Sequence, residues 1–160
     1  MPKEIELIFP ECGNRTLVAV LYEDRAPISC RRVWEILERP LEEKLGHAWP
    51  KLPELWFFVP PMPGLPYENG TVLPRAGDVV LYHYDQKGGN YVSPEGRVMA
   101  FDIGIYYAQG CSYLPVELGM TGWVSANLVG AIRDPEQLAP VVAHQFLHGK
   151  QRIIVRRKSA

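Results

Sequence analysis

Apolar and polar residues alternate at the start of the chain, which is the pattern of half-buried β-strands. Residues 3–9 alternate in this way, and a β-branched apolar run follows at residues 15–22. A turn signal, Gly13-Asn14, lies between the two stretches. The chain is therefore expected to begin with a β-hairpin.

Two other segments show the periodicity of amphipathic helices. The first, at about residues 27–39, begins with a proline, whose missing N–H needs no partner at the first helical position. The second, at about residues 134–148, begins at Asp134 and Pro135. Gln137 stands three residues after Asp134, as in a capping box. The apolar stripes consist of Cys30, Val33, Trp34 and Leu37, and of Leu138, Val141, Val142 and Phe146.

Short apolar runs between turn signals predict the remaining strands. They lie at residues 55–59, 71–73, 79–84, 98–107, 123–131 and 151–157. About eight short strands with two helices predict a mainly β fold, a closed barrel that the helices cap. A chain of 160 residues fits one domain, residues 1–160.

The composition excludes some partners. The formal net charge is −1, so no overall field attracts nucleic acid or an anionic membrane, and neither partner is expected. The basic C-terminal residues Arg152, Arg156, Arg157 and Lys158 fit a solvated last strand and tail.

The ends of the chain and the cysteines suggest a cytoplasmic protein. No run approaches the ~20 apolar residues of a membrane helix, and the N-terminus lacks the apolar core of a signal peptide. The chain has three cysteines, Cys12, Cys30 and Cys111, an odd number at long spacings. Reduced thiols are the simplest interpretation.

Both ends of this pattern resemble the cyclophilin family. Residues 16–37 resemble the opening of a cyclophilin, in which an apolar strand leads through an acidic turn and an Ala-Pro step into a helix. Residues 127–138 and the strand at 152–155 are similar to its closing strand, helix and strand. The resemblance covers about half of the chain and implies a cyclophilin-like closed barrel.

The middle of the chain departs from true prolyl isomerases. Their catalytic strand carries an arginine that polarises the prolyl amide, but residues 46–74 contain none. The strand at residues 99–107 also lacks their Gln-Phe-Phe signature. Prolyl isomerase activity is therefore not expected. The chain is more similar to small bacterial and archaeal cyclophilin-like proteins of undefined function, through residues 77–82, 105–107 and 122–127.

Histidine and cysteine chemistry each have a simpler alternative. His144 and His148 can share a helix face and bind a metal, but no third ligand is apparent, so no metal or cofactor is expected. His83 and Asp85 can form a proton-transfer pair or be a solvated strand end. Cys111 can be a nucleophile only with a base that the sequence does not name, and an ordinary loop cysteine is favoured.

Two long segments predict a ligand cleft. The proline-rich stretch up to Gly64 and the loop at residues 108–122 are long for a compact barrel, and such loops are usually functional or disordered. Together they can wall an aromatic cleft for a small organic molecule of the amide or carboxylate type. The candidate ligand-binding residues are His47, Trp49, Phe58, Tyr82, Tyr107, Gln109, Trp123 and Asn127.

Two other functions stay open. The same cleft can bind proline-containing peptides with low isomerase activity, or the protein can be a non-catalytic subunit, for example of a homo-oligomer. Residues 60–66 can also be a polyproline ligand for a partner. No constellation of residues in the sequence demands catalysis.

Overall fold

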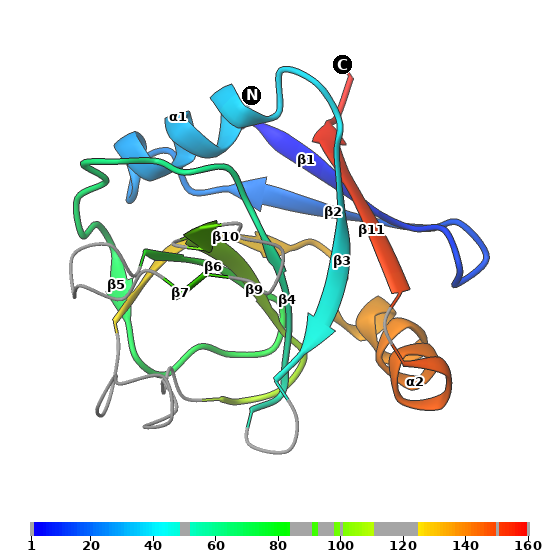
Figure 1. The fold of residues 1–160 in the computed structure, drawn as a ribbon. Coiled ribbons are helices and arrows are strands. Elements are labelled where there is room, and N and C mark those ends of the chain that lie inside the picture. Colours follow the sequence, from blue (N-terminus) through cyan, green and yellow to red (C-terminus); the bar gives the residue numbers. More distant parts are fainter. Residues whose placement is uncertain are drawn as a thin grey trace.

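The computed structural model describes residues 2–48, 52–83, 91–92, 98–99, 101–110, 125–149 and 151–159. Its strands are β1 (Glu4–Phe9), β2 (Arg15–Leu21), β3 (Leu41–His47), β4 (Glu54–Phe58), β5 (Gly70–Thr71), β6 (Asp78–His83), β7 (Tyr91–Val92), β8 (Val98–Met99), β9 (Phe101–Tyr106), β10 (Ala126–Ile132) and β11 (Gln151–Arg157). The helices are α1 (Pro27–Ile36), the short 3₁₀ helix η3 (Pro135–Gln137) and α2 (Leu138–His148) (Figure 1).

Eight strands of the described chain form a closed antiparallel barrel. They follow the order β2-β1-β11-β3-β4-β9-β6-β10, and β10 pairs again with β2. Gly130 allows the backbones of β10 and β2 to approach closely, because a Cβ at that position would collide with the carbonyl oxygen of Val20. The short strand β5 pairs with β10, and β7 and β8 form a separate hairpin. The expected closed, mainly β barrel is confirmed.

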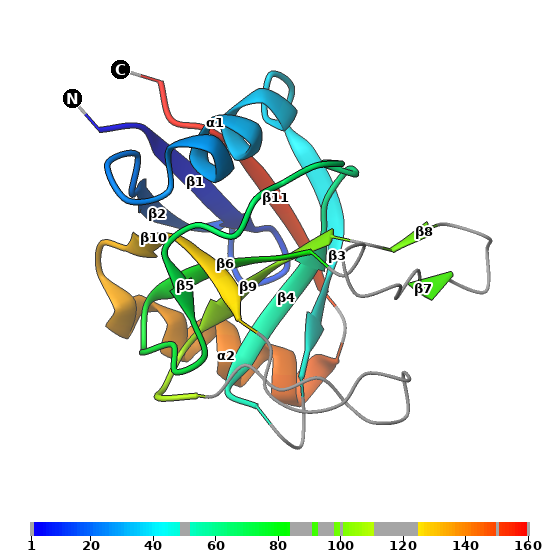
Figure 2. The same cartoon turned by 90° about the vertical axis from the view of Figure 1, so that its left-hand side faces the viewer.

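The barrel interior is the main hydrophobic core, because alternate strand residues point inward. Large buried members are Ile5, Leu7, Phe9, Leu55, Phe57, Leu81, Ile103, Ile105, Ile153 and Val155. Residues of both helices join this core, and α1 and α2 lie over opposite ends of the barrel (Figures 1 and 2). The prediction of two capping helices is therefore confirmed.

The helix boundaries differ from the predicted ones. The first helix ends at Ile36 rather than near residue 39, before the turn that leads into β3. The segment predicted as one helix from residue 134 divides into η3 and α2. Asp134 makes no side-chain capping bond, and the side chain of Gln137 accepts a hydrogen bond from Arg15 at 2.8 Å instead. The expected capping box is thus replaced by a link between η3 and β2.

Strand β3 was not expected from the sequence, because its polar residues hide the alternation. It pairs with β11 along Leu41–Leu45, and Leu45 is buried. The outward Glu42 lies 3.0 Å from Arg152 of β11. This solvated ion pair across the two strands explains why the segment reads as polar while forming part of the barrel wall.

Candidate functional site

The candidate site lies on the outer face of three adjacent strands, β4, β9 and β6 (Figure 2). Their inward residues belong to the core, so the alternate residues face outward. In the register, Asp102 of β9 stands between Phe58 of β4 and Tyr82 of β6. One row along, Gly104 stands between Trp56 and Val80.

Two glycines shape this outer face. A Cβ on Gly104 would collide with the Glu54 carboxylate, so the acidic side chain lies over the bare backbone of β9. A Cβ on Gly46 of β3 would similarly collide with the indole of Trp56. The Trp56 and Phe58 rings meet edge to face, with centroids 4.9 Å apart. Glu54 of β4 therefore lies over β9, and Trp56 of β4 lies over β3.

A hydrogen-bonded chain joins the acidic group to two tyrosines. The hydroxyls of Tyr82 and Tyr106 lie 2.8 Å apart, and the Tyr106 hydroxyl donates to Glu54 Oε2 at 3.3 Å. Tyr106 is completely buried, and Glu54 is 5% exposed. Asp102, on the same face of β9, is 6% exposed. Two buried carboxyl groups thus share a sheet face with two phenols.

The surroundings of Glu54 favour its neutral form. Burial raises the pKa of Glu54 well above its ordinary value of 4.5, and the negative charge of Asp102 raises it further. The hydrogen bond from Tyr106 acts in the opposite direction. A carboxyl in this state can donate a hydrogen bond or a proton, and after ionisation it can accept one.

The residues predicted from the sequence lie in several places. Phe58 and Tyr82 belong to the outer face described above. Trp49 and Trp123 lie outside the described residues, as do Asp85 and Cys111 from the alternative predictions. Gln109 donates to the carbonyl of Pro74 at 3.1 Å. Of the described candidates, Phe58 and Tyr82 share the outer face, whereas Gln109 does not belong to it, and a common cleft stays a prediction.

His47 and Tyr107 meet beside α2. His47 Nε2 lies 2.7 Å from the Tyr107 hydroxyl, and the Phe146 ring of α2 lies 4.8 Å from the His47 ring. Burial lowers the pKa of His47 and raises the pKa of Tyr107. This pair is at the end of the barrel that α2 covers.

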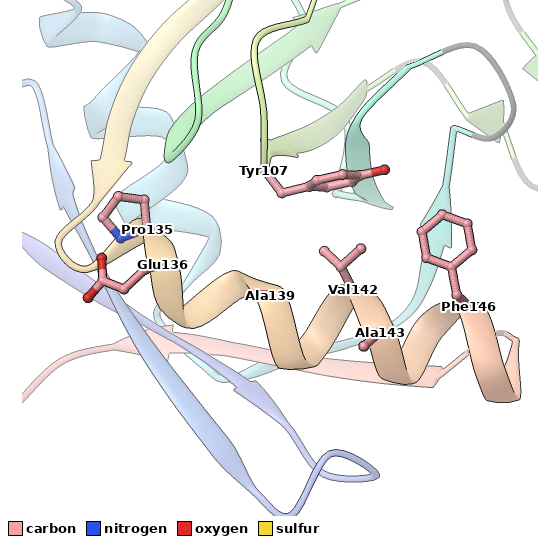
Figure 3. A pocket seen from close by; sticks show the side chains of 7 residues that line it. All are labelled: Tyr107, Pro135, Glu136, Ala139, Val142, Ala143 and Phe146. Carbon is pink, nitrogen blue, oxygen red and sulfur yellow. The ribbon is translucent and has the colours of Figure 1, made fainter.

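A shallow groove of about 340 Å³ lies between Tyr107 and α2. Val142 and Phe146 point from the helix toward the Tyr107 ring (Figure 3). The lining residues are Tyr107, Pro135, Glu136, Ala139, Val142, Ala143 and Phe146. Glu136 is the only acidic group among them, so this groove offers little polar chemistry.

Asn127 is fully engaged within the protein. Its Oδ1 accepts a hydrogen bond from the Glu68 amide at 3.0 Å, and its Nδ2 donates to Ser29 Oγ and to the Pro66 carbonyl. The Glu68 carboxylate in turn accepts from the Ser29 amide at 2.7 Å. Asn127 therefore fixes residues 66–68 against α1, and a ligand role for it stays a prediction.

The histidine candidates have local partners. The rings of His144 and His148 lie 4.5 Å apart on α2, and His83 packs 4.3 Å from Tyr67. Among the described residues, no three ligating side chains come together. In the same part of the chain, no helix is long and apolar enough to span a membrane.

Glu54 and Asp102 are the functional candidates that sequence reasoning missed. Their signal is an acidic residue at the edge of, or inside, an apolar run: Glu54 opens ELWFF, and Asp102 interrupts FDIGIY. Burying a charged group in a strand that is covered on both faces costs free energy. Such groups are therefore found disproportionately at functional sites. What the sequence cannot show is that the two runs are neighbours in the sheet.

Comparisons with known proteins give a family and a fold. The family model described as "Protein of unknown function (DUF3830)" matches residues 11–151. A solved structure described as McbB in complex with tryptophan is similar, with a TM-score of 0.64 and 17% sequence identity. The match covers 98% of this chain and 45% of that one, so the chain spans less than half of that protein. No curated protein matches.

Proposed function

Because the chain belongs to the DUF3830 family of proteins of unknown function, we propose from the site itself that it binds a small organic molecule on the outer face of β4, β9 and β6. The observation that carries this proposal is Glu54, a buried carboxyl linked to Tyr106 and Tyr82 on that face. Such groups are expensive to bury, and shifted carboxyls of this kind cluster at functional sites.

The aromatic residues beside Glu54 supply the apolar part of such a site. Trp56 and Phe58 are only partly buried, so their rings offer contact area next to the buried acid. Apolar walls with a few convergent polar groups are typical of small-molecule sites. Phe58 and Tyr82 therefore remain candidate ligand residues, now joined by Trp56 and Glu54.

The charge of the face selects among ligands. A carboxylate would face two acidic groups, Glu54 and Asp102, whereas an amide can donate its N–H to a carboxyl and accept from a tyrosine. Of the amide and carboxylate types expected from the sequence, the amide is favoured. The barrel fold and the partial likeness to cyclophilins are compatible with this use of an outer sheet face, and β4 has no arginine to support prolyl isomerisation.

A thermal-shift screen tests the proposal. Wild-type protein is scanned with small aromatic amides, amines and carboxylates, with tryptophan among them because the similar solved structure is described as containing it. A ligand at about 100 times its Kd stabilises the protein by about 2.7 kcal/mol, which is a shift of several degrees. A flat screen on well-folded protein would contradict the proposal.

A matched pair of variants locates the binding. Phe58→Ala removes a ring from the outer face, and Phe146→Ala removes one from the groove beside α2. We expect the ligand-induced shift to fall in the first variant and to persist in the second. The reverse result would move the site to the groove.

A further inference from the structure

We propose that the ligand of the outer face carries a basic amine, and that its ammonium group binds the Glu54 carboxylate. This inference rests on the proposed function and deepens it, because it names the ligand's charge. It makes Glu54 the group that selects the ligand, and it places the ligand's apolar part against Trp56 and Phe58.

The hydrogen bonding of Glu54 is incomplete within the described protein. Its Oε2 accepts one long hydrogen bond, from the Tyr106 hydroxyl at 3.3 Å, and its Oε1 accepts none from a described residue. A carboxylate has room for about four hydrogen bonds. Because the side chain is only 5% exposed, water does not easily supply the missing donors. An ammonium group with three N–H donors would supply them.

Three carboxylates in or just after β1 each pair with a cation of the chain. Lys158 lies 2.7 Å from Glu4, Arg156 lies 2.6 Å from Glu6, and Arg152 lies 2.6 Å from Glu11. The sequences of β4, β6 and β9 contain no lysine or arginine, and among the described residues no basic group contributes to the electrostatic surroundings of Glu54. A cation that satisfies this carboxylate therefore has to come from outside these strands.

The neighbouring groups suit an amine attached to an apolar body. Gly104 leaves the backbone under the Glu54 carboxyl without a side chain, so no Cβ obstructs that side. The Tyr82 and Tyr106 hydroxyls can accept a further N–H. Trp56 and Phe58 present ring edges and faces beside them, and an aromatic ring attracts a nearby cation.

Binding should release a proton. The titratable groups that face Glu54 are Asp102 and Tyr106 of β9, with Tyr82 of β6 behind Tyr106. An ammonium ion stabilises the ionised carboxylate, so a protonated Glu54 loses its O–H proton to solvent while the ligand keeps all of its own protons. Amine affinity therefore rises with pH until Glu54 is already ionised in the unliganded protein.

Calorimetry with three probes of one shape tests the inference. The probes are 2-phenylethylamine, 2-phenylacetamide and phenylacetate, which share a benzene ring and differ in the charge of the head group. Each is titrated into the full chain in two buffers of different ionisation enthalpy, so that proton release is measured directly. We expect the amine to bind most tightly and to release a fraction of a proton that falls as pH rises.

Two variants connect the preference to Glu54. Glu54→Gln keeps the shape of the side chain and should weaken the amine about tenfold or more, remove proton release and leave the amide nearly unchanged. Glu38→Gln, a change at an exposed carboxylate on the turn after α1, should leave all three affinities unchanged. Circular dichroism of both variants confirms that they are folded.

The outcomes separate this inference from the proposed function. If the amide or the carboxylate binds as tightly as the amine, or if Glu54→Gln leaves the amine affinity intact, the amine preference is wrong while a small-molecule site remains. If the broader screen finds a ligand for this face and 2-phenylethylamine does not bind, the inference is also overturned alone. If neither experiment finds any ligand, both proposals are contradicted.

Discussion

At the scale of single residues, two features define the outer face: Gly104 has no side chain, and Glu54 places a buried carboxyl group over it. The missing Cβ at Gly104 lets an acidic side chain lie flat on the sheet, where burial and Asp102 disfavour its charge. A protein selected only for stability would place an apolar residue at this position. We therefore expect Glu54 to lower the free energy of unfolding, and this effect can be measured.

Glu54→Gln should stabilise the protein, and the gain should grow with pH. In the folded state the pKa of Glu54 lies above its ordinary value of 4.5, so the folded state holds this proton after the unfolded state has lost it. Stability from this group is complete below about pH 4.5 and declines as pH rises through the folded pKa. Urea denaturation at several pH values should show a gain of about 1–3 kcal/mol near pH 8.

The same series contains its own control. Glu38→Gln, at an exposed position, should follow the wild-type curve at every pH. A Glu54→Gln variant that is equally or less stable than the wild type at pH 8 would show that the carboxylate is well accommodated.

Gly104→Ala should displace the Glu54 carboxyl. The new methyl group meets a carboxylate oxygen and lies 3.0 Å from Val80 Cγ2, so we expect a loss of about 1–2 kcal/mol in urea denaturation. Truncating the partner in the double variant Gly104→Ala/Glu54→Ala should recover part of that loss. Additive effects of the two changes would mean that the side chains do not compete for this space.

At the scale of elements, the start of α1 is held by a distant residue rather than by its own cap. Ala26 offers no capping side chain, and Glu68 accepts hydrogen bonds from the Ile28 and Ser29 amides at 3.1 and 2.7 Å. Asn127 holds the Glu68 amide in place. The segment before β5 therefore serves as the helix cap.

Glu68→Gln should weaken this cap in a pH-dependent way. Burial opposes ionisation of Glu68, but the hydrogen bonds from Ser29 and Ile28 and the charge of Arg31 together lower its pKa. Its contribution is present above about pH 4.5 and is lost as pH falls through the lowered pKa. Thermal unfolding should show a cost of about 0.5–2 kcal/mol near pH 7 that fades near pH 3. A cost that does not change with pH would point to packing instead of charge.

The sequence predicted elements wherever the pattern was local. The hairpin β1–β2, the strand β11 and the start of α1 at Pro27 follow from alternation, β-branched runs and proline. Strand β3 was not predicted because its outward Glu42 is paired with Arg152 of β11, more than a hundred residues away in the chain. The capping box at residue 134 failed because Gln137 has a partner in β2.

The candidate site was predicted only in part for the same reason. The aromatic residues of the sequence predicted Phe58 and Tyr82 as ligand-binding candidates, and both lie on the outer face of β4, β9 and β6. Asn127 instead holds the segment before β5, and His47 and Tyr107 pair beside α2. The register of β4 with β9 places Glu54 opposite Tyr106, with the Glu54 carboxyl over Gly104. This register is a long-range property that no local sequence pattern contains.

At the scale of the whole molecule, the outer face is part of the wall of a closed barrel, so its geometry depends on that closure. Closure occurs where β10 pairs with β2, and Gly130 allows the close approach of the two backbones. Ion pairs of Arg152 with Glu11 and Glu42, and of Arg156 with Glu6, lie along β1, β11 and β3, and both arginines are about half exposed. Exposed pairs contribute little to stability, so closure depends on backbone contact and the core.

Gly130→Ala should therefore affect the entire molecule. Its methyl group would collide with the Val20 carbonyl, a backbone atom that cannot turn away as a side chain can. We expect a loss of about 2–3 kcal/mol in guanidinium denaturation, with one cooperative transition. Arg152→Ala, which breaks two exposed ion pairs, should cost much less. Equal costs for the two variants would mean that the barrel seam is not tight.

The most direct measurement for the outer face is the titration of Glu54 itself. In protein labelled with carbon-13 at the glutamate carboxyls, the Glu54 signal is assigned by its loss in Glu54→Gln and followed against pH, with and without 2-phenylethylamine. We expect a midpoint well above 4.5 in the unliganded protein, and a fall of that midpoint when the amine is added. A midpoint near 4.5 that the amine does not move would contradict both the buried acid and its role in binding.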